Sequence, residues 1–404
     1  MLSKKLFKRC VDMLYGDRTW AEVNLDAIQS NILNIRKSLA DNTKIMAVVK
    51  ADAYGHGCLE TANKLIESGV DYFAVACVDE ALLLRRHGVK EPILILGSTA
   101  KERYNEVIDN NITQTIFDFE SAKMLSEKAE NKDIKAKVHI KIDTGMARLG
   151  FLYGYDDKDN DATVEDILKI ASLKGIDAEG IFTHFALADE PESDFTEKQF
   201  ADFMDLIAKL EQNGVKFRYR HCCNSAATLE FPHMHLDMVR PGIILYGCYP
   251  SDKVKSKFEL TPAMQFRTRV TNVKKVAKGS PISYGGTFVT DKEMTVATIP
   301  VGYADGFPRT LGENAKVIVK GKIVPVLGRI CMDQCMIDVT SVNNINVSDE
   351  VTIFGKQGDS SIPVESVAEF SNTINYEILC SVGKRIPRVY LQDGNVATVL
   401  NFLE

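Results

Sequence analysis

The sequence predicts an α/β protein with an N-terminal (β/α)8 barrel of the TIM type, followed by a C-terminal domain of mainly antiparallel strands. Between about residues 24 and 250, short apolar segments alternate with amphipathic helical segments. After residue 257 this pattern gives way to strands separated by Lys-Gly and Asn-rich turns. A chain of 404 residues is also long enough for two or three domains. We therefore expect an N-terminal extension and first strand at 1–22, the barrel at 23–257 and the β domain at 258–404.

The barrel prediction rests on eight short apolar segments separated by helical ones. Their number and their span of roughly 230 residues match a (β/α)8 barrel. A doubly wound open sheet is the alternative, and it is less favoured because no G-x-G-x-x-G follows the first of these strands. The predicted strands are Ile45–Val49, Tyr72–Cys77, Pro92–Leu96, Thr113–Phe117, Val138–Ile142, Gly180–Thr183, Tyr219–Cys223 and Met238–Gly242. The predicted helices include Leu59–Gly69, Asp79–Gly88, Glu120–Ala129, Thr163–Leu173 and Thr196–Asn213.

The second domain is predicted from segments that alternate or run apolar, with turn residues between them. One short helix, Val364–Phe370, interrupts the strands. The predicted strand segments are Gln265–Val276, Met294–Pro300, Val317–Val326, Met336–Val339 and Glu350–Phe354.

Composition narrows the function classes. Hydrophobic residues make up 45% of the chain and charged residues 26%, as in a globular protein. The net charge of -6 gives no sign of nucleic-acid binding. No apolar run approaches the length of a membrane span. The N-terminus lacks the apolar region and cleavage site of a secretory signal, so we expect a short extension of a cytoplasmic protein.

The cysteines agree with that compartment. Their number, nine, is odd, which argues against a disulfide framework in a chain of this length. A metal site formed by His221, Cys222 and Cys223 with His233 and His235 is conceivable. No C-x-x-C pair is present, however, so we expect buried structural cysteines and no metal.

The strongest chemical signal is Lys50, which ends the apolar run Ile45–Val49. A lysine that leaves the core at a strand end is costly to bury unless it is paired, neutral or covalently used. A desolvated lysine with a lowered pKa is suited to Schiff-base chemistry. Tyr54, Gly55 and Gly57 follow with a hydroxyl and backbone amides suited to an anion. Taken alone, a lysine at a strand end more often extends its side chain to solvent, and the rest of the chain reverses that preference.

Other polar residues fall at the ends of later strands, where a barrel carries its active site. Lys141 ends one strand and Arg148 follows in a glycine-containing loop, which could otherwise be a salt-bridged rim. His184 lies among apolar residues and could be a core histidine. Asn224 and Ser225 precede a helical run, where Ser225 either caps the helix or binds a phosphate. The last strand ends at Arg240, Gly242 and Ile243, and the last two barrel loops often form a phosphate site.

These motifs together resemble the fold-type III pyridoxal-phosphate enzymes, and within them the alanine racemase family. The resemblance covers roughly Thr19 to Tyr390. The matching segments occur in the family's order, and they are AVVKADAYGHG, KIDTGMARLG, THFA, NSAA, RPGIILYG, SYGGTF, GYADGF and GRICMDQ.

The resemblance implies a role for each candidate residue. Lys50 would carry pyridoxal 5′-phosphate as an imine and act as one base, and Tyr284 would be the opposing base from a partner subunit. The enzyme would be a homodimer that interconverts L-alanine and D-alanine and supplies D-alanine for the bacterial cell wall. Cofactor-binding residues would be Lys50, Tyr54, Arg148, His184, Asn224, Ser225, Arg240, Gly242 and Ile243. Substrate-binding residues would be Arg148, Met332, Cys331 and Tyr303, with Lys141 possibly carbamylated to support Arg148.

The physics of racemisation agrees with two different bases. A single base would return the proton to the face it came from, so inversion needs one base on each side of the α-carbon. Arg240 rarely gives up its proton, so it should leave a facing pyridine nitrogen unprotonated and weaken the electron sink. This would limit transamination.

One position departs from the family. Lys384 stands where the family often has a tyrosine that contacts the phosphate and limits substrate size, so serine or broader turnover is an alternative. A fold-type III decarboxylase is less favoured, because its glycine-triplet loop and catalytic cysteine are not found. A non-enzymatic cofactor carrier is also less favoured. Such a protein would resemble the barrel alone, whereas this chain has a β domain that carries SYGGTF and CMDQ.

Overall fold

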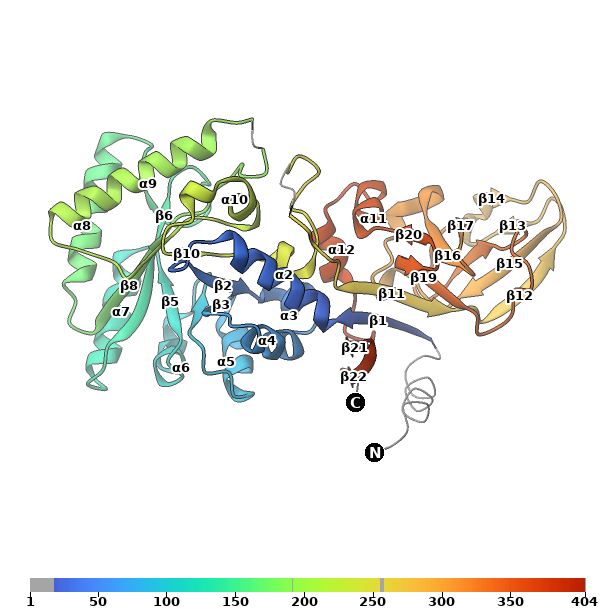
Figure 1. Cartoon of the computed structure of the whole chain (residues 1–404), viewed down its shortest axis with the longest axis horizontal. Helices are drawn as coiled ribbons and strands as arrows, with labels where there is room; N and C mark the ends of the chain where they lie inside the picture. Colours follow the sequence, from blue (N-terminus) through green and yellow to red (C-terminus); the bar gives the residue numbers. More distant parts are fainter. Residues whose placement is uncertain (1–17, 191, 255–257, 404) are drawn as a thin grey trace. The chain divides into compact units, whose positions relative to one another are not determined.

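The computed structural model of the chain describes residues 18–190, 192–254 and 258–403 (Figure 1). They divide into two compact units. The barrel unit comprises Ile28–Ala53 and Cys58–Thr261, and the β unit comprises residues 18–27, Tyr54–Gly57 and 262–403. The extension expected before residue 18 and the domain boundary expected at residue 257 lie outside the described residues.

The barrel unit is built on a parallel sheet with the strand order β10-β2-β3-β4-β5-β6-β8-β9, in which β7 also pairs with β6. Its two end strands are joined by backbone hydrogen bonds from Asp237 N to Arg220 O (3.2 Å) and from Arg240 N to Cys223 O (3.0 Å). The sheet is therefore nearly closed, and the predicted barrel is confirmed. Each predicted strand overlaps one of the observed strands β2 Lys44–Val48, β3 Tyr72–Val75, β4 Ile93–Ile95, β5 Thr113–Ile116, β6 Ala136–Asp143, β7 Phe151–Leu152, β8 Ile176–Phe182, β9 Tyr219–His221 and β10 Met238–Val239.

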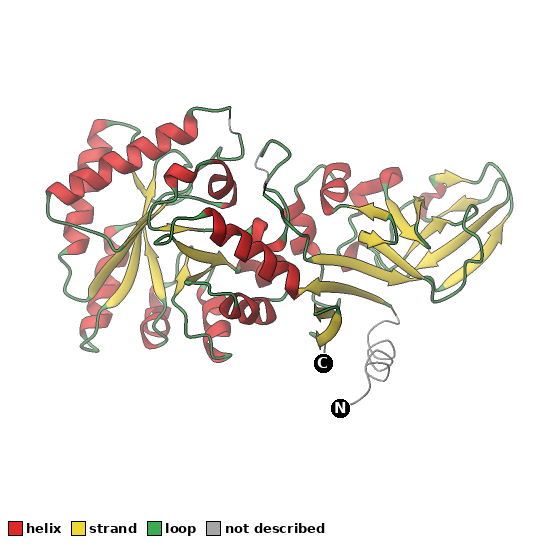
Figure 2. Ribbon diagram, viewed as in Figure 1, coloured by secondary structure: helices red, strands yellow, loops and turns green. Residues whose placement is uncertain are grey.

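Helices surround the barrel strands (Figure 2). Asp118, Asp156 and Asn224 cap α7, α8 and α10, because each side chain accepts a backbone N–H of the first helical turn. The five predicted helices correspond to α4, α5, α7, α8 and α9. The helices are α2 Leu25–Ser38, α4 Cys58–Glu67, α5 Val78–Arg86, α6 Tyr104–Asp109, α7 Phe119–Glu130, α8 Asp157–Ala171, α9 Phe195–Gln212 and α10 Ser225–Glu230.

The β unit contains a sheet with the order β12-β15-β18-β17-β16-β19-β11-β1-β21-β22, with β20 paired to β19. Strand β1 pairs in parallel with β21 and antiparallel with β11, and the other strand pairs described in this unit are antiparallel. The strands are β1 Thr19–Asn24, β11 Met264–Arg269, β12 Asn272–Val276, β13 Pro281–Ile282, β14 Phe288–Val289, β15 Met294–Ile299, β16 Lys316–Val319, β17 Lys322–Leu327, β18 Cys335–Asp338, β19 Glu350–Gln357, β20 Ser360–Ile362, β21 Arg388–Gln392 and β22 Asn395–Leu400.

The β unit differs from its prediction in three details. The segment Gln265–Val276 forms two strands, because the chain changes strand partners at Val270. Val270 is apolar and buried, so the sequence shows no turn residue at this point. The segment Val317–Val326 is a hairpin of β16 and β17. Beside the predicted helix α11 (Val364–Phe370) there is a second helix, α12 (Asn375–Ser381), which was not predicted.

Within the described part of the chain, no helix combines the length and the apolar character that a membrane crossing requires.

Candidate active site

Lys50 follows β2 and begins α3 (Lys50–Tyr54), a short turn whose backbone is left-handed. The next three residues, Ala51–Ala53, have φ angles of 53°, 54° and 54°. This left-handed conformation costs a residue other than glycine about 1–2 kcal/mol. The turn is held from α5, where a carboxylate oxygen of Glu80 accepts the Ala51 N–H (2.7 Å). Backbone strain is thus located directly beside the lysine that the sequence singled out.

Arg240 is buried just beyond the end of β10 and is fixed by four hydrogen bonds. It donates to His221 Nδ1 (2.9 Å) and His184 Nδ1 (3.2 Å), and to the carbonyls of Thr183 (2.9 Å) and Cys222 (3.0 Å). Burial lowers the pKa of Arg240 to about 10. The guanidinium therefore has a single, fully determined position between two histidines.

His221 is the partner of Arg240 that sequence reasoning did not find. It was considered only as a metal ligand with Cys222 and Cys223. The thiols of both cysteines instead donate to the Met234 carbonyl, at 3.1 and 3.2 Å. Among the described residues, no group of three or more His, Cys, Asp or Glu side chains is arranged to hold a metal ion. The sequence could have indicated His221 by its position, because it lies at the end of the strand that neighbours the strand of Arg240.

His184 lies in a basic environment. Burial lowers the pKa of His184 well below its ordinary value, and the charges of Arg240, Arg148, Lys141 and Lys50 lower it further. Burial likewise lowers the pKa of Lys141 to about 7, with Arg240 and Arg148 acting in the same direction and Asp143 opposing them. The strand ends of the barrel thus form a basic region around His184.

Asp143 organises the loop that carries Arg148. One of its carboxylate oxygens accepts the backbone N–H groups of Gly145, Met146 and Ala147, and the other accepts that of Arg148 (2.9 Å). Although burial raises the pKa of Asp143, these hydrogen bonds and one from the Tyr155 hydroxyl (3.0 Å) lower it overall. Asp143 was not among the predicted site residues, because an aspartate beside a glycine turn is common and only the folded loop shows its partners.

The segments around Ser225 and Gly242, which the sequence assigns to a phosphate, lie next to each other. The Ser225 hydroxyl accepts the Gly242 N–H at 2.8 Å. Ser225 does not cap α10, as one of the two readings held, because Asn224 occupies the cap and accepts the Ala227 N–H (3.0 Å). Ile243 begins the short 3₁₀ turn Ile243–Tyr246 directly after Gly242.

A second group of predicted residues lies together in the β unit. Tyr284, Cys331 and Met332 line a hollow of about 600 Å³. The loop of Tyr303 is joined to them, because its N–H donates to Cys331 O (3.0 Å). The side chains of Tyr284 and Met332 are 70% and 53% exposed, unusually high for large apolar groups. The β unit therefore presents a tyrosine and its neighbours on its surface.

Two other predicted positions are in the β unit. Tyr54 is buried, its ring centre lies 5.9 Å from that of Tyr376, and burial raises the pKa of its phenol. Lys384 is exposed, and its ammonium lies 6.0 Å from the centre of the Phe402 ring.

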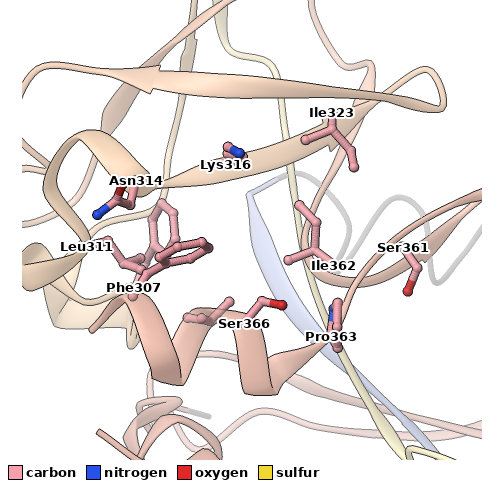
Figure 3. A pocket seen from close by; sticks show the side chains of 11 residues that line it. Phe307, Leu311, Asn314, Lys316, Ile323, Ser361, Ile362, Pro363 and Ser366 are labelled. Carbon is pink, nitrogen blue, oxygen red and sulfur yellow. The ribbon is translucent and has the colours of Figure 1, made fainter. Parts of the chain in front are cut away.

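Another hollow of the β unit, of about 200 Å³, contains none of the predicted site residues (Figure 3). It is lined mostly by apolar side chains from the segments before β16 and around α11, among them Phe307, Leu311 and Ile362. Its polar groups, such as Ser366 and Lys316, do not form a cluster of titratable side chains.

The fold and the basic site define an enzyme that combines a barrel with a β domain. Two family models match the chain, "Alanine racemase, N-terminal domain" at residues 23–250 and "Alanine racemase, C-terminal domain" at residues 263–390. The chain is 46% identical over 386 residues to "Alanine racemase 2" of Caldanaerobacter subterraneus, covering 96% of this chain and 98% of that protein. It is 48% identical over 373 residues to "Alanine racemase" of Desulforamulus reducens, covering 92% and 98%.

A solved structure described as alanine racemase from Clostridium difficile superimposes with a TM-score of 0.91 at 42% identity, covering 96% of this chain and 99% of the other. The chain belongs to the alanine racemase family. It is accordingly a racemase, an enzyme of the isomerase class, and the decarboxylase and the broad-specificity alternatives are not favoured.

Proposed function

We propose that this racemase interconverts L-alanine and D-alanine with pyridoxal 5′-phosphate bound in the barrel. The observation that carries the proposal is the buried Arg240 beyond the end of β10, hydrogen-bonded to His184 and His221, with the charges of Lys50, Lys141 and Arg148 acting on the same His184. We also propose that the enzyme is located in the cytoplasm and supplies D-alanine for the cell wall.

The residues present suit an anionic cofactor. The basic region holds Lys50, Lys141, Arg148 and Arg240, and the oxygens of Asp143, a carboxylate near Lys141, are already occupied by backbone N–H groups. A group with a phosphate and a phenolate would balance this excess of positive charge. We assign the phosphate to the Asn224, Ser225, Gly242 and Ile243 segments and the phenolate to Arg148. The assignment of a further phosphate contact to Tyr54 rests on its sequence motif.

The residues divide the work of inversion between two faces of the substrate. The cofactor supplies an electron sink that makes the α-hydrogen acidic. Lys50 Nζ takes or returns the proton on one face, and Tyr284 Oη does so on the other. Arg240 stays protonated near neutral pH and would place its positive charge at the pyridine nitrogen of the cofactor. Met332, Cys331, Tyr303 and Arg148 position the substrate.

The exposure of Tyr284 supports a homodimer with shared sites. A phenol on an open surface is a poor base, because water surrounds it and nothing holds it against the substrate. Tyr284 and Met332 would be covered if a second copy of the chain placed its barrel mouth over them. We therefore assign the two bases of each site to different subunits.

A screen of L-amino acids for loss of optical rotation tests reaction and substrate together. L-alanine is expected to lose rotation fastest, with D-alanine as the product in an enantiomer-specific assay. Serine is the informative competitor, because Lys384 stands where the family often has a size-limiting tyrosine. Loss of rotation from serine alone would replace the proposed substrate, and no loss from any amino acid would end the proposal.

Carbamylation of Lys141 is a separate prediction. With a pKa of about 7, the amine is largely neutral above that pH and can add to carbon dioxide. The new N–C bond releases one N–H proton and leaves an anion that Arg148 and Arg240 would stabilise. Protein equilibrated with ¹³C-bicarbonate should give a carbamate carbon signal that grows as the pH rises through about 7. Lys141→Gln should lack it, and a signal equally absent from the unaltered protein would refute the modification.

A further inference from the structure

A line of buried polar side chains runs through the barrel from Arg240 to Glu179. Arg240 Nη1 lies 2.9 Å from His221 Nδ1, and His221 Nε2 lies 2.8 Å from His139 Nδ1. His139 Nε2 faces Glu179 Oε1 at 3.6 Å. Arg240 lies beyond the end of β10, whereas Glu179 contacts Tyr72 and Thr113, the first residues of β3 and β5. The line therefore connects the site to the opposite end of the barrel.

The donors and acceptors along this line have only one consistent arrangement. Arg240 can only donate, so His221 Nδ1 must accept and the proton of the neutral ring lies on Nε2. His221 Nε2 then donates to His139 Nδ1, which leaves the proton of His139 on its own Nε2, facing Glu179. Burial lowers the pKa of both histidines, so neutral rings are expected near neutral pH. Every N–H group thus points away from Arg240 and toward Glu179.

Glu179 is suited to be the acceptor at the end of this line. Burial raises the pKa of its carboxyl, but the hydrogen bonds of His139, Tyr72 and Arg218 act against burial and favour the carboxylate. Arg218 donates to the other oxygen, Oε2, at 2.9 Å. His139 Nε2 has no hydrogen-bond partner within 3.5 Å among the described residues, so Glu179 is the group that its N–H faces.

The rings have little freedom to leave this arrangement. Phe182 stacks on His221, with ring centres 4.8 Å apart and an angle of 5°. Gly180 lies opposite His139 in the sheet, and a Cβ at this position would lie 2.6 Å from the His139 ring. Both histidines are fully buried. Phe182 and Gly180 therefore leave space for one orientation of the His221 and His139 rings.

We propose that Glu179, His139 and His221 are positioning residues that fix the direction of Arg240 and keep it charged. The inference rests on the proposed function only in assigning Arg240 to the cofactor. The line itself depends on the four side chains and their spacing. A carboxylate behind a histidine commonly selects the ring's tautomer, and its loss disturbs the reaction without changing the fold.

The first test needs no variant. The chain has seven histidines, so selective ¹⁵N labelling of the holoenzyme gives few ring signals to assign. Both His139 and His221 should show one protonated nitrogen, Nε2, and an accepting Nδ1. A proton on Nδ1 of either ring, or a doubly protonated ring, at neutral pH would overturn the proposal.

The second test reverses the direction in which the N–H groups along this line point. In Glu179→Gln, Arg218 can only donate, whereas the Tyr72 and Thr113 hydroxyls can also accept. The amide oxygen should therefore face Arg218 and the NH2 group should face His139. The tautomers of both histidines should then reverse, which sets an N–H of His221 against Arg240. We expect kcat to fall by about tenfold or more, with little change in KM and a shifted absorption band of the bound cofactor.

Asp177→Asn is the matched control, because Asp177 binds the same Arg218 (2.6 Å) from the same strand without facing His139. It should leave the tautomers, kcat and spectrum unchanged. Equal losses of kcat in both variants with unaltered ring signals would contradict the proposal. The ring signals also separate this proposal from the proposed function, because they report the tautomers whether or not alanine is turned over.

Discussion

Lys50→Ala is expected to yield a protein without the yellow colour of an imine-bound cofactor and to lower kcat by about 10⁴-fold or more, because one residue is both attachment point and base. In the unaltered holoenzyme, borohydride should reduce the imine to a stable amine, and peptide mapping should place the adduct on Lys50. The measurements are the visible absorption spectrum and the mass of the modified peptide.

Two variants control this result. Lys50→Arg keeps the positive charge but cannot form the imine, so it should lose colour as well. Lys141→Gln removes the other strand-end lysine and should keep the adduct on Lys50. A Lys50→Ala protein that stays yellow and carries the adduct elsewhere would show that the wrong amine had been identified.

Tyr284→Phe is expected to lower kcat by about 10²–10⁴-fold, the usual contribution of a positioned acid or base. The loss should be uneven, because Lys50 can still exchange the hydrogen on its own face. Exchange of the L-alanine α-hydrogen with heavy water should slow most, and that of D-alanine should slow less. Proton NMR of each enantiomer in heavy water measures both rates. Unchanged exchange in both directions would remove Tyr284 from the reaction.

A mixture of the two inactive variants tests the shared site. If each site takes Lys50 from one subunit and Tyr284 from the other, random hybrid dimers of Lys50→Ala and Tyr284→Phe contain one intact site. Activity should return to about one quarter of the unaltered level after subunit exchange. If both bases came from one subunit, no hybrid would contain an intact pair and the mixture would stay inactive.

The strands of the barrel could be predicted because parallel strands covered on both faces are continuous apolar runs. Lys50 and Lys141 were visible for the same reason, since each places a cation at the end of such a run. Arg240 and His184 were found by their strand-end positions. In each case the signal lies within a few neighbouring residues.

The missed features depend on partners that are distant in the sequence. His139 and Glu179 lie within strands, and only the closed barrel shows that their side chains face one another. Asp143 needed the folded loop to reveal its four N–H partners. Strand β1 pairs with residues more than two hundred positions away, a register that no local pattern specifies.

The gathering of Lys50, Lys141, Arg148 and Arg240 also affects how firmly the barrel resists heat. Like charges in a small volume repel, so the empty protein carries an electrostatic penalty in its folded form that the unfolded chain escapes. Any anion that binds only the folded form shifts the equilibrium toward it. Loading with the cofactor should therefore raise the melting temperature, and purification in phosphate or sulfate buffers should give part of the same protection.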